Sequence, residues 1–322
     1  LSVALSNAVS GDTVKLTKNV TCSNTITLKK GRDFTIDLNG KTLTLIKQLQ
    51  IKSDFVTVKN GTIAGDVALI ASDTDVPYNS FTLAEDAKID TTGYGIIVLQ
   101  KEVGANNFGT TVNINGKING NQSALWVNGS IRTDLEAAKN PVTVNVGPKA
   151  VMKNTSNNGT ALQMAGSCVV TIEGGAEIAG NTAIEVRAGK LTVKGGTITG
   201  TGTPTSVAPN GSGTTTEGVG IAVSPHATAL PIDVVVNDGR ISGHTGFYMT
   251  NPEGCENADN FKATINGGFF AAISGGNNAV AKDNNAEKMT LSVSGGYFTS
   301  DPTAYLTEGK MAFPITQSEY SF

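Results

Sequence analysis

Cysteine, histidine, aromatic residues and charge are all scarce in this chain, and each scarcity excludes a class of protein. Three cysteines and two histidines are spread over 322 residues, without the spacing of a zinc site or of a disulfide framework. Charged residues make up 16% of the chain and the formal net charge is -3, so the sequence lacks the basic surface that nucleic acid requires. It also contains no apolar run long enough for a membrane-spanning helix. We therefore expect no resident metal or other cofactor, no nucleic-acid partner and no insertion into a membrane.

Glycine, in contrast, is abundant, with 38 residues, and many glycines close a short phrase that recurs along the chain. Val170–Gly180 reads VTIEGGAEIAG, and Leu191–Gly200 repeats it as LTVKGGTITG. Apolar residues at every second position are typical of a strand with one buried face, and paired glycines permit the dihedral angles of a sharp turn. Further copies recur at intervals of about 21 to 28 residues, a range typical of repeat architectures. These copies begin at Ile36, Val56, Val112, Val234, Ala263 and Leu291, with weaker ones at Phe81 and Val142.

The repeats predict an all-β fold, a single-stranded right-handed parallel β-helix of about ten coils. The handedness follows from the strong preference of parallel strands for right-handed crossovers. We expect one domain over residues 1–322, with the coils over 11–300, and a monomer in solution.

Both ends of the solenoid are expected to carry a helical cap, because an uncovered strand edge invites further pairing. Leu1, Leu5 and Ala8 recur at helical spacing and predict a short N-terminal helix within residues 1–10. Asp301 and Pro302 suit the start of a helix. We expect about two helical turns after them, within a C-terminal cap over 301–322.

Alignment of the repeats assigns each residue to the inside or the outside of the solenoid. The inward positions that follow the turns form one apolar ladder: Ile63, Ile89, Ile118, Ile178, Ile198, Ile241, Phe270 and Phe298. The outward positions of the first strand form a polar row: Thr57, Thr82, Asn113, Thr143, Thr171, Thr192, Val235, Thr264 and Ser292. Threonine fits a half-buried strand without any ligand, so we interpret this row as an ordinary solvated face.

A second outward row is the candidate binding surface. It contains the only tryptophan of the chain. An aromatic ring offers apolar contact to a sugar, while amides and an ion pair nearby can bind sugar hydroxyls. The candidate ligand-binding residues are Trp126, Asn128, Gln163, Glu185, Arg187 and Tyr248. The alternative is that a long loop such as Ser130–Asn140 covers Trp126.

Two insertions interrupt the repeats. Thr199–Gly218 is rich in Thr, Gly, Ser and Pro and is expected to be a corner loop. Asn251–Asn260 is acidic, and its residues Glu253, Glu256 and Asp259 are candidate calcium ligands, since calcium takes oxygen ligands from loops. Their spacing matches no calcium-loop pattern, so the expectation of no cofactor is kept beside this alternative.

The two ends of the repeat region resemble a known family. Gly11–Leu16 (GDTVKL) and Ile36–Leu43 (IDLNGKTL) resemble the opening of pectin-lyase-like right-handed parallel β-helices on bacterial surface proteins. Gly295–Leu306 (GGYFTSDPTAYL) resembles the way such repeats end in large cell-wall proteins of gut bacteria. The resemblance implies secretion and a place at the cell surface or in the cell wall, within a larger protein whose signal and anchor lie outside this chain.

Enzymes of the resembled family cleave acidic polysaccharides with clustered acidic residues. Its lyases combine aspartates that bind calcium with an Arg or Lys base, and its hydrolases use two or three aspartates on successive coils. Here Asp37, Glu173 and Glu185 each lack an acidic neighbour one coil away. Ser242–Gly246 (SGHTG) bears only a faint likeness to the Gly-His-Gly of the hydrolases. We therefore assign no catalytic residue and lean towards a protein without catalysis.

Three functions stay open at this point. The first is a non-catalytic, adhesin-like surface module that recognises a polysaccharide or a glycan on a host or neighbouring surface. The second is a polysaccharide lyase or glycoside hydrolase, which only the analogy of the fold supports. The third is a structural stalk. A stalk binds no ligand and an enzyme releases products, so binding and product assays discriminate among the three.

Overall fold

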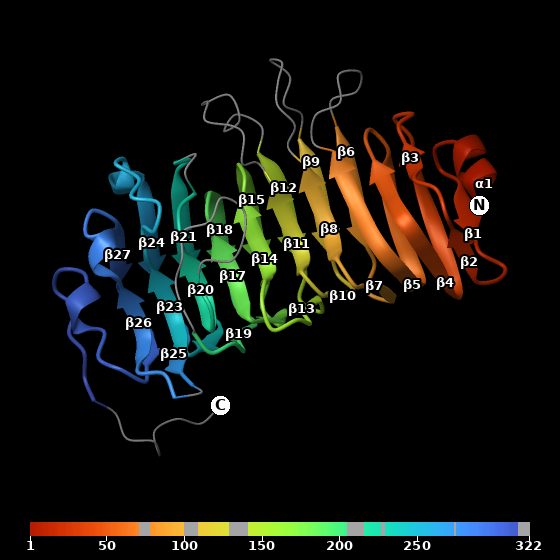
Figure 1. Cartoon of the computed structure of the whole chain (residues 1–322). Helices are drawn as coiled ribbons and strands as arrows, with labels where there is room; N and C mark the ends of the chain where they lie inside the picture. The colour runs from red at the N-terminus through yellow and green to blue at the C-terminus, as the bar shows by residue number, and fades with distance from the viewer. Residues whose placement is uncertain are drawn as a thin grey trace.

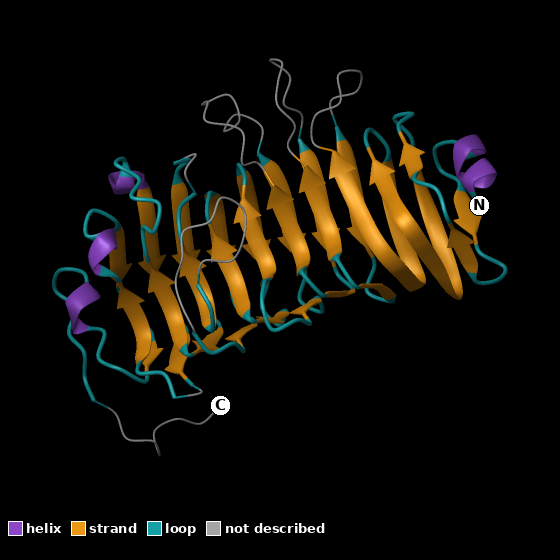
Figure 2. Ribbon diagram, in the orientation of Figure 1, coloured by secondary structure: helices purple, strands orange, loops and turns teal. Residues whose placement is uncertain are grey.

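The chain folds into one long stack of parallel strands. The computed structural model describes residues 1–70, 78–99, 109–128, 141–204, 216–226, 229–273 and 275–314. Strands account for 56% of the structure and helices for 6%, which confirms the all-β class. Every strand pairing in the described ranges is parallel and joins one coil to the next. Figure 1 shows the coils side by side from the N-terminal helix to the blue C-terminal end, and Figure 2 shows how little helix the stack contains.

The strands form three rows, one for each side of the coil. The first row contains β1 (Thr13–Lys15), the beginnings of β4 (Asp33–Ile51) and β5 (Phe55–Ile70), β6 (Asn79–Leu83), β9 (Thr110–Ile114), β12 (Val142–Val146), β15 (Cys168–Ile172), β18 (Gly189–Val193), β21 (Ile232–Val236), β24 (Phe261–Ile265) and β27 (Thr290–Val293). The second row contains β2 (Val20–Cys22), the middles of β4 and β5, β7 (Ala87–Thr91), β10 (Lys117–Gly120), β13 (Val151–Asn154), β16 (Glu177–Gly180), β19 (Thr197–Gly200), β22 (Arg240–Gly243), β25 (Phe269–Ala272) and β28 (Tyr297–Phe298). The third row contains β3 (Ile26–Leu28), the ends of β4 and β5, β8 (Tyr94–Leu99), β11 (Ser123–Asn128), β14 (Thr160–Ala165), β17 (Thr182–Val186), β20 (Val219–Val223), β23 (Thr245–Met249) and β26 (Asn278–Lys282). This is a parallel β-helix, and its rows agree with the expected number of about ten coils.

The expected inward ladder is confirmed by the strand register of the second row. The stacked residues are Ile63, Ile89, Ile118, Met152, Ile178, Ile198, Ile241, Phe270 and Phe298. Met152 fills the one position that the repeats left unassigned. All of these side chains are buried except Phe298, which is partly buried at the end of the stack. Together with the inward residues of the other rows they form one continuous core from Leu5 to Val293.

The polar residues on the outer face of the first row follow the expected alignment in every coil but one. Asn145 pairs with Asn113 and with Thr171, whereas Thr143 pairs with Thr111 and with Val169. The expected assignment of Thr143 to this row was therefore wrong by two residues. Such a shift keeps each side chain on its correct face, because the side-chain period of a strand is two.

The paired glycines mark the corner between the first and second rows. Gly175 and Gly196, the second glycine of two such pairs, both have a φ of 95°, in the region that favours glycine. A Cβ atom on Gly196 would lie 2.6 Å from the backbone oxygen of Ala176. The coils therefore stack too closely at this corner for a side chain.

A short helix covers the first coil, as expected. In α1 (Ser2–Asn7) the side chain of Leu5 has no exposed surface, and Ala8 just after the helix is also buried. Nη1 of Arg32 donates to the backbone oxygens of Leu5 and Ala8 at 2.8 Å each. Nη2 of Arg32 lies 2.6 Å from the buried carboxylate of Asp54. The helix is thus tied to the stack by a buried ion pair.

The C-terminal cap is shorter than expected. In place of about two turns, the chain forms one 3-10 turn, η3 (Thr303–Tyr305). Asp301 Oδ1 accepts from the backbone N–H of Thr303 at 2.9 Å, as a residue at a helix start does. The turn then stops, because Leu306 forms a parallel bridge with Val293 and the next N–H donates to the same strand.

The insertions lie at the corners of the coils. Asn251–Asn260 ends in the 3-10 turn η1 (Ala258–Asn260), and a further turn, η2 (Asn284–Ala286), follows β26. Ser130–Asn140 lies outside the described residues, and so do residues 205–215 of the Thr199–Gly218 insertion. No helix in the described part of the chain is both long and apolar enough to cross a membrane.

Candidate functional site

The structure brings the expected outward row of the third strands together in the expected register. Trp126 pairs with Gln163, Gln163 with Glu185, and Ala222 stands between Glu185 and Tyr248. On the N-terminal side, Ile97 pairs with Trp126. The sequence therefore placed these side chains on the correct face and in the correct order.

The row is much less open than the binding hypothesis requires. Glu185, Arg187 and Ala222 have no exposed surface, and Gln163 is 5% exposed. Trp126, Asn128 and Tyr248 keep part of their surface in contact with solvent. A ligand that approaches the folded chain can therefore touch Trp126 and Tyr248, but not the charged pair between them. Of the six candidate ligand-binding residues, Glu185, Arg187 and Gln163 are buried in this fold.

Arg187 and two acidic neighbours, Glu185 and Glu253, form a cluster of opposite charges inside the fold. Arg187 Nη1 lies 4.0 Å from Glu185 Oε1, and Arg187 Nη2 lies 3.7 Å from Glu253 Oε1. Buried charges are tolerated when opposite charges compensate them. Glu253 belongs to the Asn251–Asn260 insertion, so the pair fastens this segment to the third row.

The same insertion does not assemble the calcium ligands considered above. Glu253 faces Arg187, while Glu256 and Asp259 are exposed. Throughout the described ranges, no three His, Cys, Asp or Glu side chains are gathered closely enough to hold a metal ion.

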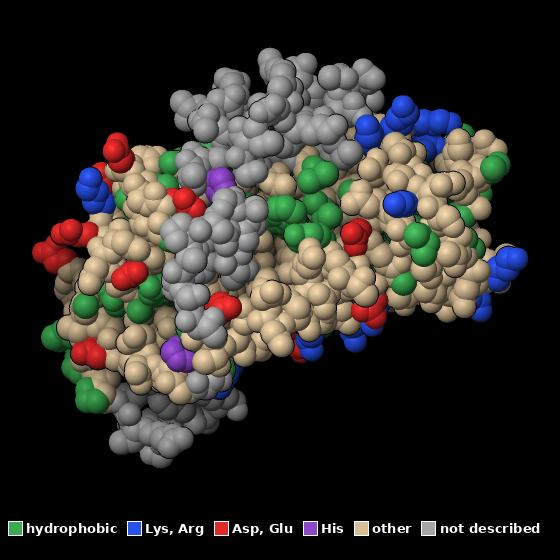
Figure 3. All heavy atoms as spheres, viewed as in Figure 1, with side chains coloured by type: hydrophobic (Ala, Val, Ile, Leu, Met, Phe, Trp, Pro, Cys, Tyr) green, Lys and Arg blue, Asp and Glu red, His purple; other side chains and the backbone are tan. Residues whose placement is uncertain are grey.

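The best-formed candidate site lies at the N-terminal end of the row, around Trp126. The ring of Trp126 stacks on Tyr94, with 4.9 Å between ring centroids and 24° between ring planes. Trp126 Nε1 is buried and has no acceptor among the described residues, so the exposed part of this side chain is its ring and not its N–H. Figure 3 shows hydrophobic side chains gathered over β8 and β11, with an acidic side chain beside them over β5.

A carboxylate stands beside this aromatic pair. Thr91 Oγ1 donates to Asp66 Oδ1 at 2.7 Å, and the N–H of Gly93 donates to Thr91 Oγ1 at 3.1 Å. A Cβ atom on Gly93 would lie 3.3 Å from Asp66 Oδ1, so the carboxylate packs against the backbone just before Tyr94. We call Asp66, Thr91, Tyr94 and Trp126 the aromatic site.

Burial changes the acidity of two groups of the aromatic site. Loss of water raises the pKa of Asp66, and the hydrogen bond from Thr91 offsets part of this effect. Burial also raises the pKa of Tyr94, and the nearby charge of Asp66 raises it further. The site thus disfavours negative charge, although its carboxylate is a strong acceptor when ionised.

Tyr94 and Asp66 were missed from the sequence. Tyr94 stands at the start of its strand, three residues before the outward position that the repeats identify, and Asp66 lies at the bend within β5. The available signal was the Thr-Gly-Tyr-Gly sequence at 92–95, where an aromatic residue sits between glycines at a corner.

Tyr248, at the other end of the row, is held by polar neighbours. Burial first, and then the carboxylate of Asp283, raise the pKa of Tyr248 to about 12. Thr250, two residues on, donates to Asn285 at 3.1 Å. Tyr248 therefore presents a neutral phenol rather than a charged group.

No protein family, no curated protein and no solved structure matches this chain.

Proposed function

We propose that this chain is a non-catalytic, adhesin-like extracellular surface module that binds a glycan at the aromatic site. The stacked pair of Trp126 and Tyr94 beside Asp66 carries the proposal. Aromatic faces pack against the C–H groups of sugar rings, and a carboxylate accepts hydrogen bonds from neighbouring hydroxyls. The pectin-lyase-like resemblance of the chain ends supports the extracellular location and the bacterial surface.

The ligand is an extended chain rather than a single sugar. Trp126 and Tyr248 are four coils apart in one row, so they stand roughly 19 Å from each other at the usual strand spacing. Asn128, which also keeps exposed surface, lies on the same strand as Trp126 and adds an amide to that end. Tyr248 is then a second, weaker contact for a long polysaccharide.

The alternatives have less support in the geometry. Glu185 and Arg187, the charged pair of the row, have no exposed surface, so a substrate does not reach them in this fold. A structural stalk would need no partly exposed aromatic stack on one of its faces.

A binding screen against neutral and acidic polysaccharides tests the proposal. Wild type, Trp126→Ala and Tyr94→Ala are compared with Phe313→Ala, which removes a 72% exposed aromatic ring far from the site. We expect Trp126→Ala to weaken binding at least tenfold, about 1.4 kcal/mol, and Phe313→Ala to leave it unchanged. A time-dependent release of oligosaccharide would overturn the non-catalytic assignment. Equal binding by all variants would mean that the aromatic site does not bind the glycan. If the wild type bound no polysaccharide, the structural stalk would be favoured.

A further inference from the structure

The aromatic site continues towards the N-terminal end of the solenoid as a row of polar side chains. Gln48 of β4 pairs with Asp66 of β5, so their side chains lie on the same face, one coil apart. Tyr94, one coil further on, stands at the same end of its strand. Gln48, Asp66 and Tyr94 all keep part of their surface in solvent. A ligand that lies on the rings of Trp126 and Tyr94 therefore reaches Asp66 and Gln48 without crossing a buried position.

Two glutamines at the end of this row can bind hydroxyl groups. Gln50, two residues after Gln48 on the same face of β4, donates from Nε2 to Gln48 Oε1 at 3.3 Å. Among the described residues this is the one hydrogen bond that either side chain makes. An amide carries two donor hydrogens and an acceptor oxygen, so Gln48 keeps its NH2 group and Gln50 its oxygen for a ligand. We call Gln48 and Gln50 the amide pair.

The charge in this row is negative. Burial raises the pKa of Asp66, and among the described residues only the hydrogen bond from Thr91 lowers it. No described cation therefore compensates the carboxylate. Lys47, in the corner just before Gln48, is exposed, where water and salt screen its charge. A carboxylate on a ligand would meet the like charge of Asp66 partly out of water, where repulsion is stronger than in bulk solvent.

We propose that the aromatic site and the amide pair together bind neutral polysaccharides and discriminate against acidic ones. One sugar ring packs on Trp126 and Tyr94, its neighbour donates hydroxyl groups to Asp66, and the chain continues onto the amide pair. Gln48 and Tyr94 are two coils apart, roughly 10 Å at the usual strand spacing. An uncompensated charge that repels the wrong ligand is a common source of specificity. The inference rests on the proposed glycan function, to which it adds the charge of the ligand and two contact residues.

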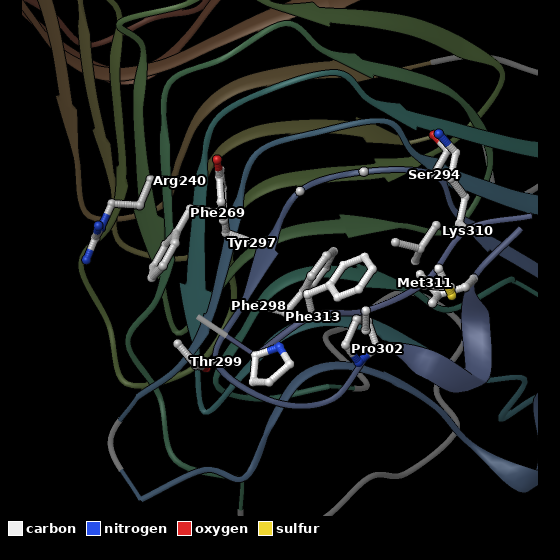
Figure 4. Close-up of a pocket in the computed structure, with 16 residues that line it drawn as sticks. Arg240, Phe269, Ser294, Tyr297, Phe298, Thr299, Pro302, Lys310, Met311 and Phe313 are labelled. Carbon is white, nitrogen blue, oxygen red and sulfur yellow. The ribbon is translucent and has the colours of Figure 1, made fainter. Parts of the chain in front are cut away.

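A second group of partly exposed aromatic side chains, at the C-terminal end, differs in charge. Phe269 and Tyr297 pair on the outer face of β25 and β28, and the guanidinium of Arg240 lies 4.7 Å from the centroid of the Phe269 ring. Figure 4 shows these three side chains along one side of a pocket of about 970 Å³. Arginine suits carboxylates, so acidic probes must be followed at the aromatic site alone. Trp126 is the only tryptophan of the chain, and its fluorescence reports that site.

Matched pairs of oligosaccharides test the proposal by titration of the fluorescence of Trp126. The probes are the β-1,4-linked hexasaccharides of glucose and of mannose, each beside its counterpart with C6 oxidised to a carboxylate. Wild type should bind the better neutral probe at least about tenfold more tightly than its acidic counterpart. Asp66→Asn removes the charge and keeps an acceptor oxygen, so it should reduce this preference to less than about threefold.

The outcomes separate this inference from the proposed function. Equal affinity for both members of a pair would overturn the selection by charge and leave the glycan site in place. An unchanged preference in Asp66→Asn would overturn the role of Asp66. If no probe changed the fluorescence of the wild type, the proposed glycan function would fail, and this inference with it.

The amide pair is tested by Gln48→Ala. This variant should bind the neutral probe at least about threefold more weakly, because it loses a hydrogen-bond donor, and should keep the preference for neutral over acidic probes. Asn145→Ala removes an exposed amide from the first row and should bind like wild type. No loss in Gln48→Ala, or an equal loss in Asn145→Ala, would contradict a contact at the amide pair. Lys47→Gln should leave the preference unchanged, and a changed preference would contradict its assignment to Asp66.

Discussion

At the scale of single residues, the folded state disfavours the ionised form of Asp66. Its carboxylate is half-buried in the aromatic site, and burial raises its pKa above the ordinary value of 3.8. The folded state therefore holds the proton more tightly than the unfolded state does. The stability that this preference contributes is fully present below pH 3.8 and is lost as the pH rises through the higher pKa of the folded chain.

Asp66→Asn should consequently stabilise the protein at neutral pH. The amide is neutral, and its Oδ1 can still accept the hydrogen bond from Thr91. Urea unfolding at pH 7 should show a higher midpoint than for wild type, and the difference should vanish at pH 3, where Asp66 is protonated. Asp259→Asn, at an exposed position, is the control. If Asp66→Asn were destabilised to the same extent at both pH values, the carboxylate would have a structural role that its burial does not explain.

The same substitution separates stability from binding. If Asp66 accepts hydrogen bonds from a glycan, Asp66→Asn weakens binding while it stabilises the fold. Such opposite effects are common where a site holds an unfavourable group for the sake of function.

At the scale of elements, the N-terminal helix depends on Arg32. This one side chain bonds two backbone oxygens at the end of α1 and an aspartate of the next coil. Asp54 itself is completely buried and also accepts from the backbone N–H groups of Lys30 and Arg32, at 2.8 and 2.9 Å. A six-residue helix has little stability of its own, so its attachment rests on these bonds and on the burial of Leu5.

Arg32→Met should detach α1 and leave the charge of Asp54 buried without its partner. Removal of one member of a buried pair costs about 3–5 kcal/mol. Chemical unfolding should show this loss, and the amide of Leu5 should exchange faster. Lys30→Met is a matched control, since Lys30 bonds the oxygen of Ser6 at the same helix end but is exposed, and it should cost less than about 1 kcal/mol. Asp54→Leu in addition to Arg32→Met should recover part of the stability, and no recovery would contradict the role of the unpaired charge.

The register of most elements could be predicted because inward residues repeat on every coil. Ile178 and Ile198 follow the same glycine pair at the same distance, so their stacking can be read from the sequence alone. The strand that holds Thr143 has five alternating residues and no glycine pair after it. A two-residue shift of such a strand leaves the same faces inside and outside, and the sequence offers nothing to exclude it.

Which outward side chains of the third row are buried could not be predicted in the same way. Glu185 and Trp126 occupy equivalent outward positions, yet only Trp126 keeps exposed surface. What covers such a position is set by contacts between distant segments, such as that of Glu253 with Arg187, and no local pattern encodes them. For the same reason, the bridge between Leu306 and Val293 ended the expected C-terminal helix early.

At the scale of the whole molecule, the chain is a row of units that each contact only their neighbours. The stability of such a solenoid is close to a sum of unit and interface contributions. An inner coil has a neighbour on both faces, whereas an end coil has one neighbour and its cap. The N-terminal cap contributes a buried leucine and a buried ion pair, while the described part of the C-terminal cap, up to residue 314, contributes one 3-10 turn and an isolated bridge.

Unfolding should therefore begin at the C-terminal end. Local opening of a coil costs the interfaces that it breaks, and β27 and β28 break the fewest. Hydrogen exchange of peptides over 290–298 should be at least about 100-fold faster than over 168–180 in the middle of the stack, a difference of about 2.7 kcal/mol. Peptides over 13–28 should exchange more slowly than the C-terminal ones in wild type, and should lose this protection in Arg32→Met. Equal exchange along the whole chain would mean that the solenoid opens as one unit, and faster exchange at the N-terminus would mean that the ion pair of Arg32 does not secure its cap.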